Sequence, residues 1–243
     1  MKVAFLGKGG SGKSTLATQC MWYLREWGNF VLAIDADHNM DLSYNLGIEP
    51  KVFLGSDPYA IKTFVGLSEK AGFAEARAYA KEKGLSFQLS PMDDFTKRMT
   101  TEVGENLLLM TAGPHTDIVR SGEHCSHSLA APLKTYLPLL KLGDTESVVI
   151  DERAGTDPVA TGILAGVDLA IIVAEPTVHS VRVAGQIAHE LDLAQVPYEF
   201  VANKVREDTK IFESLPKPPT LYVEFGAEAD FSGLFKELKM RSL

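Results

Sequence analysis

A glycine-rich stretch near the start of the chain, GKGGSGKST at residues 7–15, holds residue types that bind phosphate. Gly7, Gly12, Lys13 and Ser14 fit the Walker A spacing Gly-x-x-x-x-Gly-Lys-Ser/Thr. In such a loop the glycines let backbone N–H groups close around phosphates, and the following helix directs its positive N-terminus at them. Lys13 then reaches the β- and γ-phosphates, and the Ser14 hydroxyl is a ligand for Mg²⁺. The stretch therefore predicts a nucleoside triphosphate site.

A glycine-rich turn without a ligand is the alternative, but it leaves four glycines and two lysines within nine residues unexplained. The predicted nucleotide contacts in the loop are Gly9, Gly10, Ser11, Gly12, Lys13, Ser14 and Thr15.

Two acidic stretches follow predicted strands and could complete this site. Asp35 and Asp37 stand at the end of the run 30–35, and Asp151 ends the run SVVID at 147–151. Carboxylates at the carboxyl ends of strands, beside a phosphate loop, can bind Mg²⁺ or orient water. We predict that Asp151 lies beside Mg²⁺ and that Asp37 is functional. Asp35, on the strand itself, fits a structural role equally well.

The elements that must hold these residues alternate along the chain. Several short runs are continuously apolar, as strands buried on both faces of a parallel sheet require. The predicted strands are 2–6, 30–35, 106–112, 147–151, 169–175, 198–203 and 220–225. The predicted helices are about 14–27, 128–141, 157–166, 179–192 and 229–240. This order predicts a doubly wound α/β fold, with a mostly parallel sheet of about seven strands, helices on both faces and ligands at the carboxyl ends of the strands.

Length and composition set further limits. The 243 residues suit one P-loop domain, 1–243, with a polar insertion at about 49–104. The net charge of −8 argues against sequence-independent nucleic-acid binding, which relies on clustered Lys and Arg. Two cysteines, Cys20 and Cys125, are too few for a disulfide framework. The chain opens directly with a strand, and no apolar run approaches the roughly 20 residues that span a bilayer. We therefore expect a cytoplasmic protein.

Lys8 is a second lysine in the phosphate loop, for which the Walker A template has no role. The pattern Lys-Gly-Gly-x-Gly-Lys-Ser/Thr resembles the deviant Walker A loop of the MinD, ParA and nitrogenase iron-protein group of ATPases. This resemblance implies an ATP-bound homodimer in which Lys8 reaches the partner's phosphates and supports hydrolysis in trans, much as an arginine finger does. The alternative is a solvated loop lysine.

The same resemblance implies roles for further residues of an ATP site. Asp37 would orient the attacking water in switch I, and Asp41 matches a second switch I carboxylate. Gly155 matches the switch II glycine whose backbone N–H contacts the γ-phosphate. Asn203 and Lys204 resemble the pair that reads the adenine base. The candidate Mg²⁺ ligands are Ser14, Asp37, Asp41 and Asp151.

The segment SGEHCSHSLAAPLKTYL, residues 121–137, distinguishes between possible functions. Its Gly-Glu-x-Cys turn and following helix resemble the carbon monoxide dehydrogenase maturation ATPases, which help insert nickel and carry Cys-x-Cys there. Cys125 and His127 occupy these positions in the turn at 121–127, so two subunits could supply Cys₂His₂ donors to Ni²⁺ or Zn²⁺. The alternative is a polar turn without metal. A bridging iron–sulfur cluster is not expected, because residues 154–158 contain no second cysteine.

The C-terminal segment FSGLFKELKMRSL adds a membrane alternative. Phe231, Leu234, Phe235 and Leu238 share one face of the predicted helix, which could bind a membrane as in a MinD-like regulator. We favour packing on the sheet, because the three basic residues are few and Glu237 interrupts them.

Together these patterns predict an ATPase that dimerises on ATP binding and turns over slowly without its client. Its expected work is metallocentre maturation, with nickel insertion into a carbon monoxide dehydrogenase-like client. The alternative is a MinD- or ParA-like spatial regulator at membrane or nucleoid.

Overall fold

The computed structural model describes residues 1–115, 120–121 and 128–241. Its main sheet has eight strands in the order β10-β9-β8-β1-β7-β2-β5-β4, and a separate small sheet pairs β3 with β6. Among the named strands that these residues form, β4 runs antiparallel to its neighbour β5, and the other strand pairings are parallel. The strands are β1 Lys2–Gly7, β2 Phe30–Asp35, β3 Phe87–Gln88, β4 Thr100–Gly104, β5 Leu107–Thr111, β6 Leu140–Lys141, β7 Glu146–Asp151, β8 Leu169–Ala174, β9 Tyr198–Val205 and β10 Leu221–Glu224. The predicted α/β fold with a mostly parallel sheet is confirmed.

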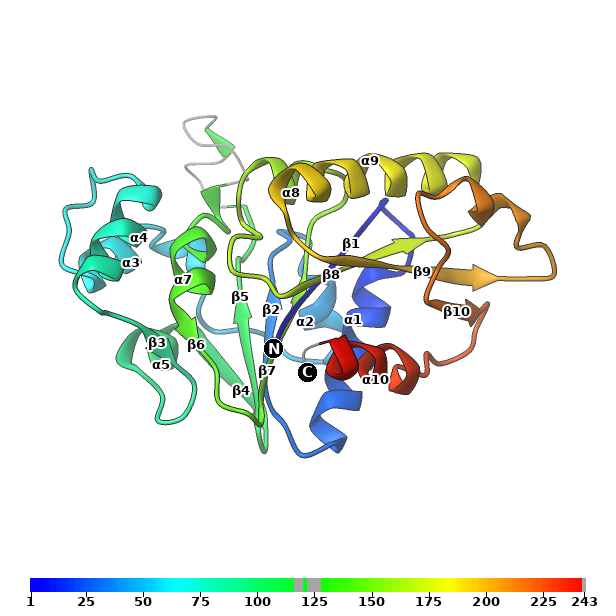
Figure 1. The fold of residues 1–243 in the computed structure, drawn as a ribbon. Coiled ribbons are helices and arrows are strands. Elements are labelled where there is room, and N and C mark those ends of the chain that lie inside the picture. Colours follow the sequence, from blue (N-terminus) through cyan, green and yellow to red (C-terminus); the bar gives the residue numbers. More distant parts are fainter. Residues whose placement is uncertain (116–119, 122–127, 242–243) are drawn as a thin grey trace.

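Helices cover both faces of this sheet (Figure 1). α1 and α10 pack on one face, whereas α7, α8 and α9 pack on the other. The strands between them, β1, β7 and β8, are buried along their whole length, as their continuous apolar runs predict. The α-helices are α1 Lys13–Glu26, α2 Asp41–Asn45, α3 Ala60–Phe64, α4 Phe73–Glu82, α5 Asp94–Met99, α7 Leu133–Leu139, α8 Asp157–Ala160, α9 Val178–Ala194 and α10 Ser232–Arg241, and the 3-10 helices are η1 Leu54–Ser56 and η3 Lys210–Ser214.

Two predicted helices are shorter in the structure. α7 covers part of the predicted 128–141 because the chain leaves the helix at Leu140 to pair with β3 as β6. α8 covers the first four residues of the predicted 157–166, and Gly162 and Gly166 then adopt φ values of +74° and +87°. A Cβ on Gly166 would lie 2.6 Å from Cα of Pro138, so a side chain has no room at this turn.

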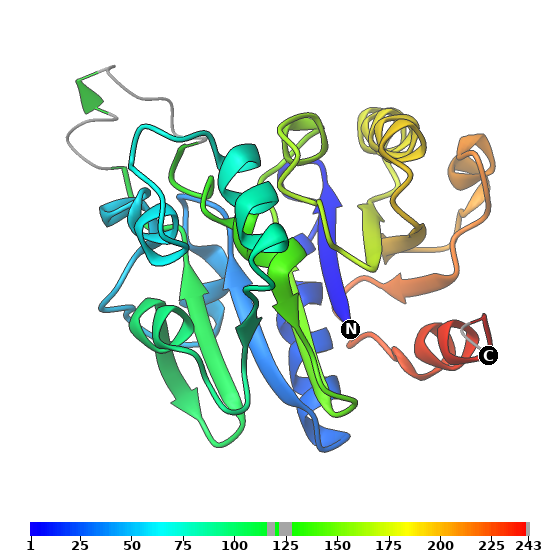
Figure 2. The ribbon, with the colours of Figure 1, turned by 60° about the vertical axis from the view of Figure 1, so that its left-hand side comes forward.

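The insertion at 49–104 supplies the eighth strand, which was not among the predicted strands. β4 is short and half exposed, so its pattern lacks the apolar run that marks the central strands. The helices of this insertion lie together beside the sheet (Figure 2). Phe87 and Phe95 of the insertion pack against Tyr136 of α7, with ring centroids 4.9 and 5.8 Å apart. The insertion is therefore joined to the sheet through an aromatic core.

The apolar face of the C-terminal helix is used in packing. Phe231, Leu234 and Phe235 are buried, and the Phe235 ring stacks on Tyr23 of α1 at 5.6 Å. The predicted packing is confirmed for these three side chains, while the side chain of Leu238 lies outside those described. Among the helices that the structure describes, none is long and apolar enough to cross a membrane.

Candidate nucleotide-binding site

The phosphate loop lies between β1 and α1, with Gly12 as the N-cap residue of the helix. Gly12 has φ +96°, and a Cβ there would meet Nδ2 of Asn203 at 2.2 Å. A Cβ on Gly7 would meet the carbonyl oxygen of Val173 at 2.4 Å. These two glycines are thus required by the fold as well as by a ligand. The loop also places the positive end of the 14-residue helix α1 where phosphates would lie.

Lys13, Ser14 and Asp151 come together beside this loop. Parallel pairing puts Asp151, the last residue of β7, level with Phe5 of β1. Lys13 is 7% exposed and Asp151 is 1% exposed. Burial raises the pKa of Asp151 to about 7, although a hydrogen bond with Ser14 and the charge of Lys13 act in the opposite direction.

This donor set fits Mg²⁺. Oδ1 of Asp151 is buried without a hydrogen-bond partner, and the Ser14 hydroxyl lies beside the same carboxylate. A carboxylate and a hydroxyl oxygen are ligands that Mg²⁺ accepts together with phosphate oxygens. When bound, Mg²⁺ would neutralise charge on the β- and γ-phosphates.

Asp35 at the end of β2 and the two predicted switch I aspartates, Asp37 and Asp41, differ in their surroundings. Oδ2 of Asp35 accepts hydrogen bonds from both the backbone N–H and the hydroxyl of Ser43, each at 2.8 Å, so Asp35 anchors α2. Asp37 lies beyond β2, where its Oδ1 accepts from the Asn39 N–H at 3.2 Å and lies 3.1 Å from Nδ1 of His38. Asp41 is exposed in the first turn of α2. The arrangement gives Asp35 a structural role, while the roles of Asp37 and Asp41 stay predictions.

Gly155 and Asn203 both contact the phosphate loop. The Gly155 N–H donates to the carbonyl of Gly7 at 3.1 Å, so the predicted contact with a γ-phosphate would compete with this bond. Nδ2 of Asn203 donates to the carbonyl of Ser11 at 2.8 Å. Lys204 donates to the carbonyl of Gly10. The predicted base-reading pair therefore also supports the phosphate loop.

Lys8 has a partner, Glu175, that was not predicted from the sequence. Its Nζ lies 3.1 Å from Oε1 of Glu175, and Lys204 reaches the other carboxylate oxygen at 3.3 Å. Glu175 directly follows β8 and is the last residue of the predicted strand 169–175, so an acid at the carboxyl end of a strand was the available signal. Lys8 is 30% exposed in its side chain, so the alternative of a freely solvated lysine does not describe it.

Two further buried residues follow Asp151 and were also missed. Both carboxylate oxygens of Glu152 are buried without a partner, as are Nε and Nη2 of Arg153. Burial raises the pKa of Glu152 to about 8, against the opposing charge of Arg153. Near the end of β5, the His115 ring stacks on His38, with centroids 4.3 Å apart. The chain that leads toward residues 116–127 therefore passes next to switch I.

The candidate transition-metal residues Cys125 and His127, like the turn 122–127 that carries them, lie outside the described residues. Among the residues that are described, no three His, Cys, Asp or Glu side chains gather in a way that could hold a metal ion. Cys20 is fully buried on α1, as a small core residue of that helix.

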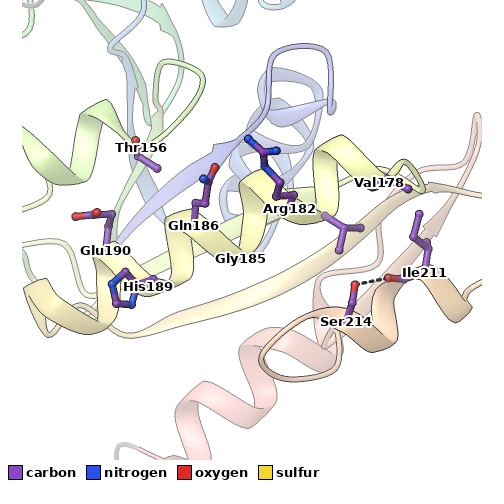
Figure 3. Close-up of a pocket in the computed structure, with 10 residues that line it drawn as sticks. Thr156, Val178, Arg182, Gly185, Gln186, His189, Glu190, Ile211 and Ser214 are labelled. Carbon is purple, nitrogen blue, oxygen red and sulfur yellow. Dashed lines mark hydrogen bonds between the residues drawn. The ribbon is translucent and has the colours of Figure 1, made fainter.

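A surface cavity of about 870 Å³ lies away from the phosphate loop, along α9. Figure 3 shows Arg182, Gln186 and His189 projecting from successive turns of this helix, with Ile211 and Ser214 of η3 opposite. Thr156, next to Gly155 in the chain, lines its other side. The phosphate-binding residues are thus separate from this cavity, although the segment after β7 adjoins both.

Known proteins share both the sequence pattern and the fold. Residues 3–216 match the family described as the CobQ/CobB/MinD/ParA nucleotide binding domain. The chain is 31% identical over 230 residues to an uncharacterized ATP-binding protein of Methanocaldococcus jannaschii, covering 92% of this chain and 87% of that protein. It is 32% identical over 211 residues to the carbon monoxide dehydrogenase accessory protein CooC of Rhodospirillum rubrum, covering 84% of this chain and 74% of that protein.

Solved structures show the same fold at lower identity. The ParA family ATPase of Chlorobium tepidum matches with a TM-score of 0.62 and 19% identity, over 92% of this chain and 84% of that chain. A putative plasmid partition protein of Borrelia burgdorferi bound to AMPPNP matches with a TM-score of 0.57 and 19% identity, again over 92% and 84%. The chain belongs to the CobQ/CobB/MinD/ParA family of P-loop ATPases.

Proposed function

We propose that this protein is an ATPase that dimerises on ATP binding and acts in metallocentre maturation, inserting nickel into a carbon monoxide dehydrogenase-like client. The observation that carries this proposal is the 32% identity to CooC, which extends over 84% of the chain. Identity at this level over most of both chains goes beyond the shared fold, whereas the MinD and ParA structures are alike in fold alone.

The nucleotide chemistry is assigned to residues that meet at the carboxyl edge of the sheet. Lys13 and the loop N–H groups bind the phosphates, while Ser14 and Asp151 bind Mg²⁺. Asp37 orients the attacking water. Lys8 is supplied in trans to the partner's phosphates, where its charge stabilises the transition state.

The metal cargo is assigned to the segment that leaves this edge. His115 stacks on His38, which in turn contacts Asp37, so a change at switch I is carried to the start of residues 116–127. Two subunits would bring two copies of Cys125 and His127 to one centre. Thiolate and imidazole donors suit both Ni²⁺ and Zn²⁺. ATP binding thereby assembles a metal site, and hydrolysis releases the metal to the client.

The test is size-exclusion chromatography with light scattering and metal analysis, in Mg·ATPγS with Ni²⁺ or Zn²⁺. Wild-type protein is expected to elute as a dimer with about one metal per dimer. Cys125→Ser should keep the dimer and lose the metal. Cys20→Ala is the matched control, because it removes the other thiol from the core and should retain the metal. A metal-free wild-type dimer would contradict the proposed binding of a metal cargo and would leave the proposed ATPase activity unaffected.

The alternative, a spatial regulator at a membrane or nucleoid, has less support. Phe231, Leu234 and Phe235 are buried within the chain, so they are not available to a membrane. Wild-type protein is expected to stay in the supernatant when sedimented with anionic liposomes in Mg·ATPγS. ATP-dependent sedimentation would favour the regulator over the maturation factor.

A further inference from the structure

Glu175 contacts lysines from two parts of the nucleotide site, the phosphate loop and β9. Its carboxylate receives Lys8 of the phosphate loop at 3.1 Å through Oε1 and Lys204 of β9 at 3.3 Å through Oε2. Lys204 also donates to the Gly10 carbonyl, which ties the same cluster to the backbone of the loop. The Glu175 side chain is 14% exposed. Burial opposes ionisation of Glu175, but the hydrogen bonds from both lysines outweigh it and hold the pKa below its usual range.

The backbone that carries Glu175 is fixed by its own contacts. The Glu175 N–H donates to Oγ of Ser180 at 3.0 Å. Its carbonyl accepts from the Thr177 N–H at 2.7 Å. Thr177 in turn is the N-cap of α9, where its hydroxyl accepts from the Ser180 N–H at 3.2 Å. The backbone of Glu175 is therefore anchored to the N-terminus of the capped 17-residue helix α9.

The two loop lysines are held differently as a result. Lys13 is buried beside Asp151 and is committed to the phosphate pocket of its own chain. Lys8 is more exposed, and its ammonium is paired with Glu175. An ammonium in this position can leave one carboxylate for another anion that approaches from solvent. Phosphate oxygens on a second subunit are such an anion.

We propose that Glu175 is the positioning residue for Lys8. Its carboxylate holds the Lys8 ammonium at the edge of its own phosphate loop, and ATP-driven dimerisation moves that ammonium from Glu175 to the partner's phosphates. The inference rests on the proposed function, because it requires the ATP-bound homodimer. Since Glu175 and the partner's phosphates compete for one ammonium, weakening the Glu175 contact favours the dimer. Lys204 keeps its carbonyl contact with Gly10 throughout the exchange.

The first measurement tests the contact itself without nucleotide. Lysine acetylation by an N-hydroxysuccinimide ester is followed by mass spectrometry for wild type, Glu175→Gln and Glu82→Gln. Glu82→Gln is the matched control, because it removes a carboxylate 3.4 Å from Lys83 at an exposed site on α4. Loss of a charge-assisted contact should raise the acetylation rate of Lys8 about threefold in Glu175→Gln and leave it unchanged in the control. Equal rates at Lys8 in all three proteins would overturn the proposal.

The second measurement tests the role in dimerisation. Sedimentation equilibrium in saturating Mg·ATPγS gives the protein concentration at which half of the chains are dimeric. We expect Glu175→Gln to lower this midpoint about 3- to 10-fold, and Glu175→Ala to shift it in the same direction. Glu82→Gln should match wild type. Circular dichroism melts of each variant show that the shifts come from folded protein.

Lys8→Ala separates this mechanism from simple charge repulsion. If Glu175 acts through Lys8, the double variant Lys8→Ala/Glu175→Gln stays monomeric, as Lys8→Ala does. A double variant that dimerises would overturn the inference, because Glu175 would then act by repelling phosphates. If wild type dimerises and Glu175→Gln has the same midpoint, the inference is overturned and the proposed function stands. If wild type does not dimerise with Mg·ATPγS, both the inference and the proposed function are overturned.

Discussion

Polar groups at the two ends of the strands of the main sheet differ in their hydrogen bonding. At the amino edge, the backbone N–H of Lys2 donates to Asp168 at 2.7 Å, its Nζ donates to the Leu137 carbonyl at 2.7 Å, and Glu146 accepts from Gly143 at 2.8 Å. At the carboxyl edge, several buried polar atoms have no hydrogen-bond partner. They are Oγ of Ser11, Oδ1 of Asp35, Oγ1 of Thr111, Oδ1 of Asp151, both Oε atoms of Glu152, and Nε and Nη2 of Arg153.

This difference marks where the protein is built for a ligand. A buried polar group without a partner costs roughly 1–3 kcal/mol, so folded proteins keep such groups few. Their concentration beside the phosphate loop leaves donors and acceptors that nucleotide and Mg²⁺ could use, with Asp151 the clearest case. Substitutions at the carboxyl edge should therefore weaken nucleotide binding. Substitutions at the amino edge should instead lower the free energy of unfolding.

The largest effect is expected for Lys13→Ala. Removing the buried ammonium should weaken Mg·ATPγS binding about 100-fold or more, because a charge-assisted contact to phosphate is lost. Isothermal titration calorimetry measures this loss. Retained affinity would show that the loop does not bind phosphate as assigned.

Asp151→Asn should come next. The amide keeps the shape of the side chain but supplies a weaker Mg²⁺ ligand, so the affinity for Mg·ATPγS should fall about 10-fold or more. The melting temperature without ligand should be unchanged or higher, because a buried carboxylate with a raised pKa is replaced by a neutral group. A lower melting temperature without ligand would contradict the contrast between the edges.

Lys2→Met is the counterpart at the amino edge. The Leu137 carbonyl would lose its donor inside the protein, which should lower the free energy of unfolding by about 1–2 kcal/mol. Affinity for Mg·ATPγS should match wild type, since Lys2 lies at the other end of β1. Urea unfolding and calorimetry test the two statements separately. Weaker nucleotide binding with unchanged stability would reverse the expected pattern.

Glu152 provides a pH test of the same contrast. Its pKa is raised to about 8 in the folded chain against an ordinary value of 4.5, so the folded state holds the proton more tightly. The contribution of this proton to the free energy of unfolding is complete below pH 4.5, the ordinary pKa. It is lost as the pH rises toward 8, by about 1 kcal/mol per pH unit. In EDTA without nucleotide, Glu152→Gln should flatten this slope between pH 6 and pH 8. Parallel slopes in urea unfolding would remove Glu152 as the cause.

The smallest effect is expected for Asn203→Ala. Nδ2 of Asn203 donates to the Ser11 carbonyl of the loop, and the sequence predicts that the amide also reads the adenine edge. Its loss should weaken ATP binding about 3- to 10-fold and reduce the preference for ATP over GTP. Competition against a fluorescent ATP analogue gives both numbers. Equal losses for ATP and GTP would assign Asn203 to loop support alone.

The features that could be predicted from the sequence are those encoded locally. The phosphate loop has a fixed spacing, and the run SVVID ends in Asp151 at the edge where ligands bind. The ends of α7 and α8 could not be predicted, because they depend on the pairing of Leu140 with Phe87 and on the close approach of Gly166 to Pro138.

The missed parts of the site depend on tertiary contacts. Glu175 is 167 residues from Lys8 along the chain, and only the order of β8 beside β1 brings them together. Similarly, the stacking of His115 on His38 requires β5 to lie beside β2. A stretch such as EPTVHSVR shows that an acid follows a strand, but it does not show which lysine that acid will bind.

The central claim is that the carboxyl edge binds ATP and that Lys8 then joins two chains. Light scattering of wild type and Lys8→Ala, with and without Mg·ATPγS, tests it most directly when nucleotide binding is measured on the same samples. We predict that wild type changes from monomer to dimer, whereas Lys8→Ala binds the nucleotide and remains monomeric. A Lys8→Ala protein that dimerises as wild type does would contradict the account.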